Sequence, residues 1–146
     1  MPLIYDGRSY DPIFRSDLCN AKAEIWIANP FLKRNRIMQL MPILSQLRAN
    51  GVSITVFTRS TEASAEKDQP AQIECIEYLR SYGIQVKPRN TFLRCTVIDS
   101  QIVWYGSVNV LTNNSPDSCV MRLESSDIAV KLTDSVIYFE SYNHQK

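Results

Sequence analysis

Histidine is nearly missing from this sequence: its 146 residues include one, His144, the third residue from the end. Histidine is the side chain whose ordinary pKa lies nearest to neutral pH, and it therefore serves in many sites as nucleophile or general base. We expect the end of the chain to fray, which makes His144 a poor candidate for a catalytic role. Chemistry that needs a histidine within the body of the chain is excluded.

Long apolar runs and an excess of one charge are also missing. No apolar run approaches the roughly 20 residues of a membrane-spanning helix. The start, "MPLIYDGRSYDP", lacks the basic first residues and the apolar run of a signal peptide. Sixteen Lys and Arg stand against fifteen Asp and Glu, a formal net charge of +1. No field of the whole molecule draws it to nucleic acid or to a membrane, so any anion must be bound by a local patch.

Cysteine is present without any sign of pairing. Cys19, Cys75, Cys95 and Cys119 are scattered and form no C-x-x-C pair, and the second and third fall within apolar patterns that are typical of buried thiols. This distribution disfavours a disulfide framework and a zinc site. It predicts reduced thiols and a cytoplasmic protein.

What is present is an ordinary globular composition, 45% hydrophobic and 21% charged, and a length that predicts one domain over residues 1–146. Apolar spacing predicts four helices, over residues 9–21, 34–51, 71–83 and 125–143. Pro42 either kinks the second helix or restarts it, and Ser125 or Ser126 caps the last. Short apolar runs predict six strands, over residues 24–28, 52–58, 84–88, 93–99, 101–107 and 119–124.

The order of these elements predicts the fold class. Strands alternate with helices in the first half, which favours parallel crossover units. The tight polar turn at Asp99-Ser100-Gln101 predicts an antiparallel hairpin. We therefore predict an α/β fold, with a mixed sheet flanked by helices on both faces.

Polar and basic residues follow several of the predicted strands. They are Asn29, Lys33, Arg34 and Arg36 after the first, Thr58 and Arg59 after the second, Lys87, Arg89 and Asn90 after the third, and Gly106, Ser107 and Asn109 after "VWY". Ligands collect at the carboxyl ends of parallel strands, so these residues predict a cleft with the chemistry of a phosphate site. The alternative for the triplet of cations is a solvated helix start that binds nothing.

The segment "FLRCTVID…WYGSVN" resembles the signature of the phospholipase D-like superfamily, which reads His-x-Lys, four residues, Asp, and later Gly-Ser-x-Asn. Phe92 and Arg94 fall at the His and Lys positions, Asp99 at the Asp position, and Gly106, Ser107 and Asn109 complete the second part. Upstream, "DLCNAKAEIWIANPFL" and "GVSITVFTR" are similar to the first two units of that family. The likeness covers residues 12 to about 135. It is greatest to the single-motif domains at the C-terminus of some bacterial superfamily 1 helicases.

The departures from this signature bear on activity. In active relatives the His attacks phosphorus, and Phe92 has no lone pair with which to do so. Arg94 keeps a positive charge but cannot give up a proton. The resemblance implies that Asp99, Ser107 and Asn109 orient the side chains at positions 92 and 94. We interpret the site as vestigial for cleavage, with no catalytic residues.

Binding is compatible with the same residues. At strand periodicity Phe92 and Arg94 point to one side, where a ring and a guanidinium can stack a base and hold its phosphate. The alternative is that Phe92 fills the space left by a lost His. Cys95 points to the opposite face and Ser107 has no adjacent base, so neither is a convincing nucleophile.

Metal and aromatic sites have weaker support. Asp99 with Asp117 or Glu124 is too scattered a set to predict a metal, and no cofactor is expected. The four aromatic residues near the sheet are expected to be core or subunit contacts; they are Trp26, Phe31, Trp104 and Tyr105.

Three hypotheses follow. The favoured one is a catalytically defective domain that binds nucleic acid, DNA rather than RNA, in its former active-site cleft. It would act with a helicase or nuclease, as a partner or as part of a longer parent chain, away from membranes, and the resemblance implies a homodimer. The second is a residual phosphodiesterase or nuclease with an unrecognised nucleophile, and the third is a structural protein-interaction module.

Overall fold

A computed structural model describes residues 2–89 and 92–144 of the chain, with side chains described up to residue 135 of the last helix. Within this part the strands are β1 (Leu3–Asp6), β2 (Glu24–Ala28), β3 (Ser53–Thr58), β4 (Gln85–Pro88), β5 (Cys95–Ile98), β6 (Ile102–Gly106) and β7 (Cys119–Glu124). The helices are α1 (Asp11–Cys19), α2 (Arg34–Ala49), α3 (Gln69–Ser81) and α4 (Ser126–His144), and two short 3-10 turns, Thr61–Ala63 and Glu66–Asp68, precede α3.

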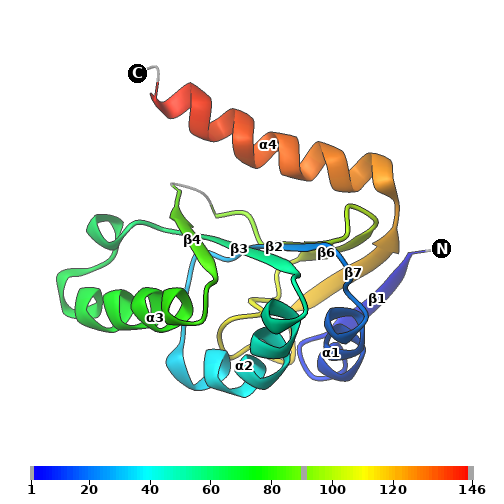
Figure 1. Cartoon of the computed structure of the whole chain (residues 1–146), viewed down its shortest axis with the longest axis horizontal. Helices are drawn as coiled ribbons and strands as arrows, with labels where there is room; N and C mark the ends of the chain where they lie inside the picture. Colours follow the sequence, from blue (N-terminus) through cyan, green and yellow to red (C-terminus); the bar gives the residue numbers. More distant parts are fainter. Residues whose placement is uncertain (1, 90–91, 145–146) are drawn as a thin grey trace.

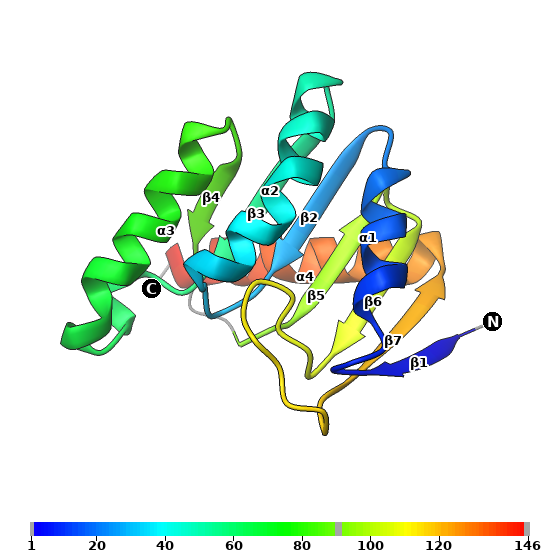
Figure 2. The ribbon, with the colours of Figure 1, turned by 90° about the horizontal axis from the view of Figure 1, so that it is seen from below.

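All the strands join one mixed sheet in the order β1-β7-β6-β5-β2-β3-β4 (Figure 2). β2, β3 and β4 pair in parallel through helical crossovers, whereas β2–β5, β5–β6, β6–β7 and β7–β1 pair antiparallel. α1, α2 and α3 cover one face of the sheet, and α4 crosses the other (Figure 1). The predicted fold class, including the hairpin of β5 and β6, is confirmed.

The larger part of the core lies between the sheet and helices α1 to α3, where Phe14 and Leu44 are fully buried. The rings of Trp104 on β6 and Phe14 lie nearly perpendicular with their centres 5.5 Å apart, and the indole N–H of Trp104 donates to Asp17 at 2.8 Å. The buried Asp17 carboxylate also accepts a hydrogen bond of 2.6 Å from Nε of Arg122 on β7. An apolar core and one neutralised buried carboxylate therefore fix α1 to two strands.

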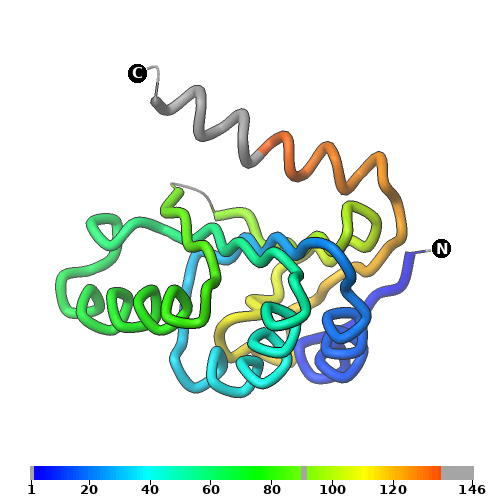
Figure 3. The backbone as a smooth tube through the Cα atoms, viewed as in Figure 1, coloured from blue at the N-terminus to red at the C-terminus, as the bar shows by residue number. Residues whose placement is uncertain are grey.

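The face under α4 has a smaller apolar core. Trp26 lies partly buried there, and Ala129 of α4 is fully buried. The Ser125 hydroxyl accepts a hydrogen bond from the Ile128 amide, which confirms Ser125 as a cap of the helix. The Ser125 amide in turn donates to the Gln101 carbonyl, so the start of α4 is joined to the turn between β5 and β6 (Figure 3).

The structure adds one strand to the sequence prediction and excludes one of the two alternatives for Pro42. Strand β1 was not predicted, because its four mostly exposed residues show no alternation and its conformation comes from pairing with β7. Helix α2 continues through Pro42, so no new helix starts there; the exposed proline removes one internal hydrogen bond from an otherwise well-packed helix. No helix in residues 2–89 and 92–144 is long and apolar enough to cross a membrane.

Candidate functional site

The strand directions bring the predicted site residues to one edge of the sheet. The parallel strands β2, β3 and β4 end there. β5 runs opposite to β2 and therefore begins there, and β6 runs opposite to β5 and ends there. The predicted convergence of residues after β2, β3, β4 and β6 is confirmed at the level of the backbone; Asn90 lies outside the described residues.

Arg94 is a cation at this edge whose side chain is oriented by a hydrogen bond. Its Nε donates a 2.8 Å hydrogen bond to Oδ1 of Asn109, and its guanidinium carbon lies 6.0 Å from the centre of the Phe31 ring. Asn109 is itself held on both sides of its backbone by the Asn114 side chain, through two hydrogen bonds of 2.7 Å. Within the described part of the chain, the two terminal nitrogens of Arg94 have no hydrogen-bond or ion-pair partner. They form a fixed fork that is available to an anion.

Phe92 and Arg59 form a second pair of ring and cation. The Arg59 guanidinium carbon lies 4.8 Å from the centre of the Phe92 ring, and its Nη2 donates to the Ala63 carbonyl at 3.0 Å. Strand β5 begins at Cys95, so the strand alternation expected for positions 92 and 94 does not apply. Phe92 is 63% exposed, which disfavours the alternative that its ring fills the space left by a lost His.

Phe31 was expected to be a core or subunit contact, yet it is 43% exposed and lies beside Arg94. Two buried side chains hold the segment that carries it. The side-chain amide of Asn29 donates to the Phe31 carbonyl, and the Thr58 hydroxyl donates to the Pro30 carbonyl. Thr58 is fully buried, so its predicted role as a phosphate ligand is wrong: it supports the loop after β2 instead. The segment "ANPF" has the pattern expected at the end of an apolar strand, and this pattern does not show whether the Phe31 ring is exposed or buried.

A cleft of about 630 Å³ adjoins these residues, between the loop after β2 and the start of α3. Its charged lining residues are Lys33, Arg34, Arg59, Asp68 and Glu74. Arg34 forms an ion pair with Glu74, so much of its charge is neutralised. Lys33 is exposed and remains a candidate phosphate ligand.

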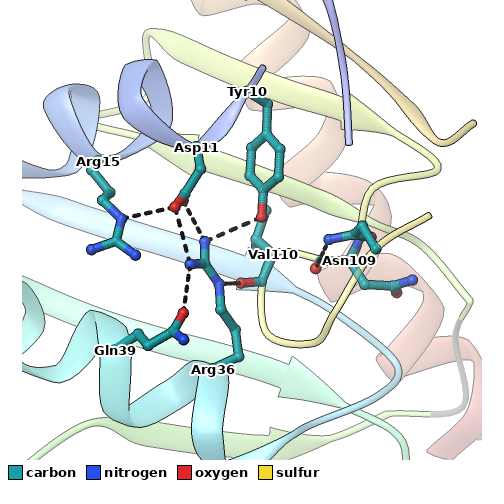
Figure 4. A network of polar contacts seen from close by, with 8 residues as sticks. Tyr10, Asp11, Arg15, Arg36, Gln39, Asn109 and Val110 are labelled. Carbon is teal, nitrogen blue, oxygen red and sulfur yellow. Dashed lines mark hydrogen bonds and ion pairs between the residues drawn. The ribbon is translucent and has the colours of Figure 1, made fainter. Parts of the chain in front are cut away.

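Arg36 was predicted as a phosphate ligand, but its guanidinium is buried and bound within the protein (Figure 4). It is 6% exposed, and its guanidinium binds both oxygens of Asp11, the Tyr10 hydroxyl at 3.1 Å and the Val110 carbonyl at 2.9 Å. Burial raises the pKa of Asp11, but the hydrogen bonds and charges of Arg36 and Arg15 outweigh burial and lower it. Arg36 thus ties α1 and α2 to the segment that carries Asn109.

Asp99 lies at the opposite edge of the sheet, where β5 ends. Its carboxylate accepts hydrogen bonds of 2.8 to 3.0 Å from the backbone amides of Lys22, Ala23 and Glu24, which lead into β2. Burial raises the pKa of Asp99, but these three bonds outweigh it, and the net effect is a lowered pKa. The expected orienting role toward Phe92 and Arg94 is therefore wrong for Asp99.

Ser107 and Gly106 join β6 to β7. The Ser107 hydroxyl accepts a hydrogen bond from the Cys119 amide at 3.0 Å and donates to the Cys119 carbonyl at 3.3 Å. A Cβ at Gly106 would lie 2.4 Å from the same carbonyl oxygen, so only glycine fits. Ser107 therefore supports the loop that carries Asn109 and does not point its hydroxyl at Arg94.

The third predicted group follows β4, the strand at one end of the sheet order. Arg89 packs over the Phe57 ring with its guanidinium carbon 5.6 Å from the ring centre, and its amide donates to the Thr58 carbonyl at 2.7 Å. Lys87 is exposed on the edge strand. The site therefore consists of Arg94, Asn109, Phe31, Phe92 and Arg59, with Lys33 at the adjoining cleft.

Comparisons with known proteins agree with this architecture. The model of the family described as "Cardiolipin synthase, PLD-like domain" matches residues 14–142. No curated protein matches the chain. The solved structure of Nuc, a phospholipase D family member from Salmonella typhimurium, is similar with a TM-score of 0.71 and 16% identity, over 97% of this chain and 95% of that one. NucT from Helicobacter pylori gives a TM-score of 0.72 and 15% identity, over 97% of this chain and 96% of that one. TrmBL2, an archaeal chromatin protein with a novel mode of DNA binding, gives a TM-score of 0.63 and 13% identity, over 99% of this chain and 52% of that one.

Proposed function

The chain belongs to the phospholipase D-like family, and from this premise we propose that it binds the phosphates of nucleic acid at the Arg94 site without cleaving them. The observation that carries the proposal is the guanidinium of Arg94. Its Nε donates a 2.8 Å hydrogen bond to Asn109, which orients the guanidinium. Among the residues that the structure describes, its two terminal nitrogens have no hydrogen-bond or ion-pair partner. Such a fork matches two oxygens of one phosphate, and holding it in place beforehand lowers the entropic cost of binding.

The lack of cleavage follows from the atoms at the site. Phe92 stands where the family's nucleophilic His would be, and a phenyl ring cannot attack phosphorus. Burial raises the pKa of the neighbouring Cys95 thiol to about 12, so it carries almost no thiolate at neutral pH. The Ser107 hydroxyl is engaged with the backbone of Cys119. No side chain in this group can readily form a covalent intermediate.

The preference for nucleic acid rests on charge and on relatives. Arg59 and Lys33 line the cleft, and Arg94 lies beside the Phe31 ring, which also lines it. None of these three cations has an ion-pair partner among the residues the structure describes. A structural neighbour is a DNA-binding chromatin protein. We propose DNA as the preferred ligand over RNA, and action beside a helicase or nuclease, as its partner or within one chain. The resemblance to single-motif domains supports a homodimer.

The test is fluorescence anisotropy of labelled DNA and RNA titrated with the purified protein over a series of salt concentrations. The logarithm of the binding constant falls with the logarithm of salt by about 0.7 per contacted phosphate for single strands and about 0.9 for duplexes. We expect Arg94→Ala to weaken binding and to lower this slope by about one contact. Lys22→Ala is the matched control, because it removes one exposed positive charge at the opposite edge of the sheet.

Two outcomes would contradict the proposal. If neither DNA nor RNA binds at low salt, the site is not a nucleic-acid site, and a structural interaction module becomes the better account. If clean protein cleaves the labelled strand and Asn109→Ala abolishes that cleavage, the protein is a residual phosphodiesterase.

A further inference from the structure

Two exposed phenyl rings flank the proposed phosphate fork. Phe92 is 63% exposed and Phe31 is 43% exposed, although both are large apolar side chains. Each lies beside a cation, Phe92 against Arg59 and Phe31 against Arg94. Single exposed apolar residues need no explanation, but two rings at one charged edge form a specific chemical surface.

The four side chains form a continuous surface. Arg94 lies against Phe31, Phe31 and Arg59 both line the cleft of about 630 Å³, and Arg59 lies against Phe92. Rings and guanidinium groups therefore alternate in this row, and its two middle members, Phe31 and Arg59, line the cleft. A nucleic-acid strand has the same alternation, since each nucleotide presents one flat base and one phosphate.

The protein holds both rings before any ligand arrives. The buried Asn29 side chain binds the Phe31 carbonyl, which fixes the loop that carries the first ring. Arg59 is anchored to the Ala63 carbonyl at 3.0 Å and packs against the Phe92 ring. Groups that are already ordered lose little conformational entropy when they bind.

From this arrangement we infer that the site takes single-stranded nucleic acid in preference to duplex, with unpaired bases stacked on Phe92 and Phe31. The inference rests on the proposed function and names the class of ligand for the same site. In a duplex the flat faces of the bases are covered by their neighbours, so an exposed phenyl ring has no base face to contact. In a single strand the faces are accessible, and stacking on aromatic side chains tolerates any sequence.

The experiment compares three labelled probes of equal length at one salt concentration: single-stranded oligo-dT, a duplex, and an abasic strand that keeps the phosphates without bases. We expect oligo-dT to bind most tightly and the abasic strand to bind about tenfold or more weaker. Phe92→Ala and Phe31→Ala should each weaken oligo-dT binding by about tenfold, a typical effect of losing one stacked base. Neither change should alter the salt slope, because no phosphate contact is removed.

The matched control is Tyr82→Ala. Tyr82 is also 43% exposed, but it follows α3 at the opposite edge of the sheet, where its ring packs against Tyr78. We expect it to leave binding of all three probes unchanged. Phe92→Tyr, which keeps a ring, should retain most of the affinity for oligo-dT that Phe92→Ala loses.

The inference and the proposed function fail in different ways. Equal binding of the three probes, with both Phe→Ala variants matching Tyr82→Ala, would overturn the stacking inference. The proposed function would survive that result if Arg94→Ala still lowered affinity and salt slope. Absence of binding to every probe at low salt would overturn both and would favour a protein ligand for the two rings.

Discussion

Replacement of Asp99 by Ala separates a structural role of the motif aspartate from a role in ligand binding. The Asp99 carboxylate accepts three backbone hydrogen bonds, from Lys22, Ala23 and Glu24, and thereby joins the end of β5 to the start of β2. Asp99 also adopts a φ of 54°, in the left-handed region. It lies at the edge of the sheet opposite Arg94, so its loss should change stability and leave the ligand site intact.

The size of the effect follows from these contacts. Each lost bond to a partly solvated amide costs about 1 kcal/mol, and Ala in the left-handed region adds about 1 kcal/mol. Asp99→Ala should therefore lower the free energy of unfolding by about 4 kcal/mol. Asp99→Asn should cost about 1 to 2 kcal/mol, because its oxygen can replace Oδ1, which accepts two of the bonds, while its NH₂ group opposes the Lys22 amide. Asn also tolerates a positive φ.

The assay is urea unfolding followed by tryptophan fluorescence, in which the midpoint should fall and the slope m should stay constant. The pH dependence adds a second check. The folded Asp99 pKa is lowered, so its contribution to stability is fully present above the ordinary carboxyl pKa and is lost as pH falls through the folded value. The wild type should therefore lose stability in acid more steeply than Asp99→Asn does.

One result would refute this assignment of Asp99. If Asp99→Asn kept the wild-type midpoint and yet lost nucleic-acid binding, the carboxylate would act on the ligand site despite its distance. Unchanged binding with a lowered midpoint supports the structural role.

Three further predictions concern the support of the site. Arg36→Ala should lower the free energy of unfolding by about 3 kcal/mol in urea titrations, because it leaves the Asp11 carboxylate without its buried partner. If the variant were as stable as the wild type and its nucleic-acid affinity depended less steeply on salt, Arg36 would instead be a ligand contact. Gly106→Ala should destabilise by about 2 kcal/mol or more by calorimetry, since its Cβ would lie 2.4 Å from the Cys119 carbonyl oxygen; an unchanged melting temperature would contradict that packing. Cys95 should resist a thiol reagent at pH 8 in the folded protein, because burial raises its pKa to about 12; rapid modification located at Cys95 by mass spectrometry would disprove this.

The fold was predictable because its signals are local. Alternating apolar runs, the Gly51 stop of the second helix and the turn at Asp99 each depend on neighbouring residues, and the order of elements then limits the topology. β1 escaped prediction because its pairing with β7 spans more than 100 residues and only that pairing makes it a strand.

The site was predictable in outline but not in its partners. The motif spacing placed Arg94 and Asn109 together, and the structure joins them by a hydrogen bond. Sequence cannot show which cations are neutralised by distant carboxylates, as Arg36 is by Asp11 across 25 positions. Nor can it show that Phe31 is exposed, because an apolar residue after a strand has the same pattern whether its ring faces the core or solvent.

The most direct test of the central claim is a double-mutant cycle on the affinity for single-stranded DNA, built from Arg94→Ala and Asn109→Ala. Asn109 is a positioning residue that acts through Arg94. Asn109→Ala should therefore weaken binding in the wild type and have no further effect once Arg94 is Ala, so the coupling equals the whole effect of Asn109→Ala. Equal losses in both backgrounds would show that the two side chains act independently, and the oriented guanidinium would no longer explain binding.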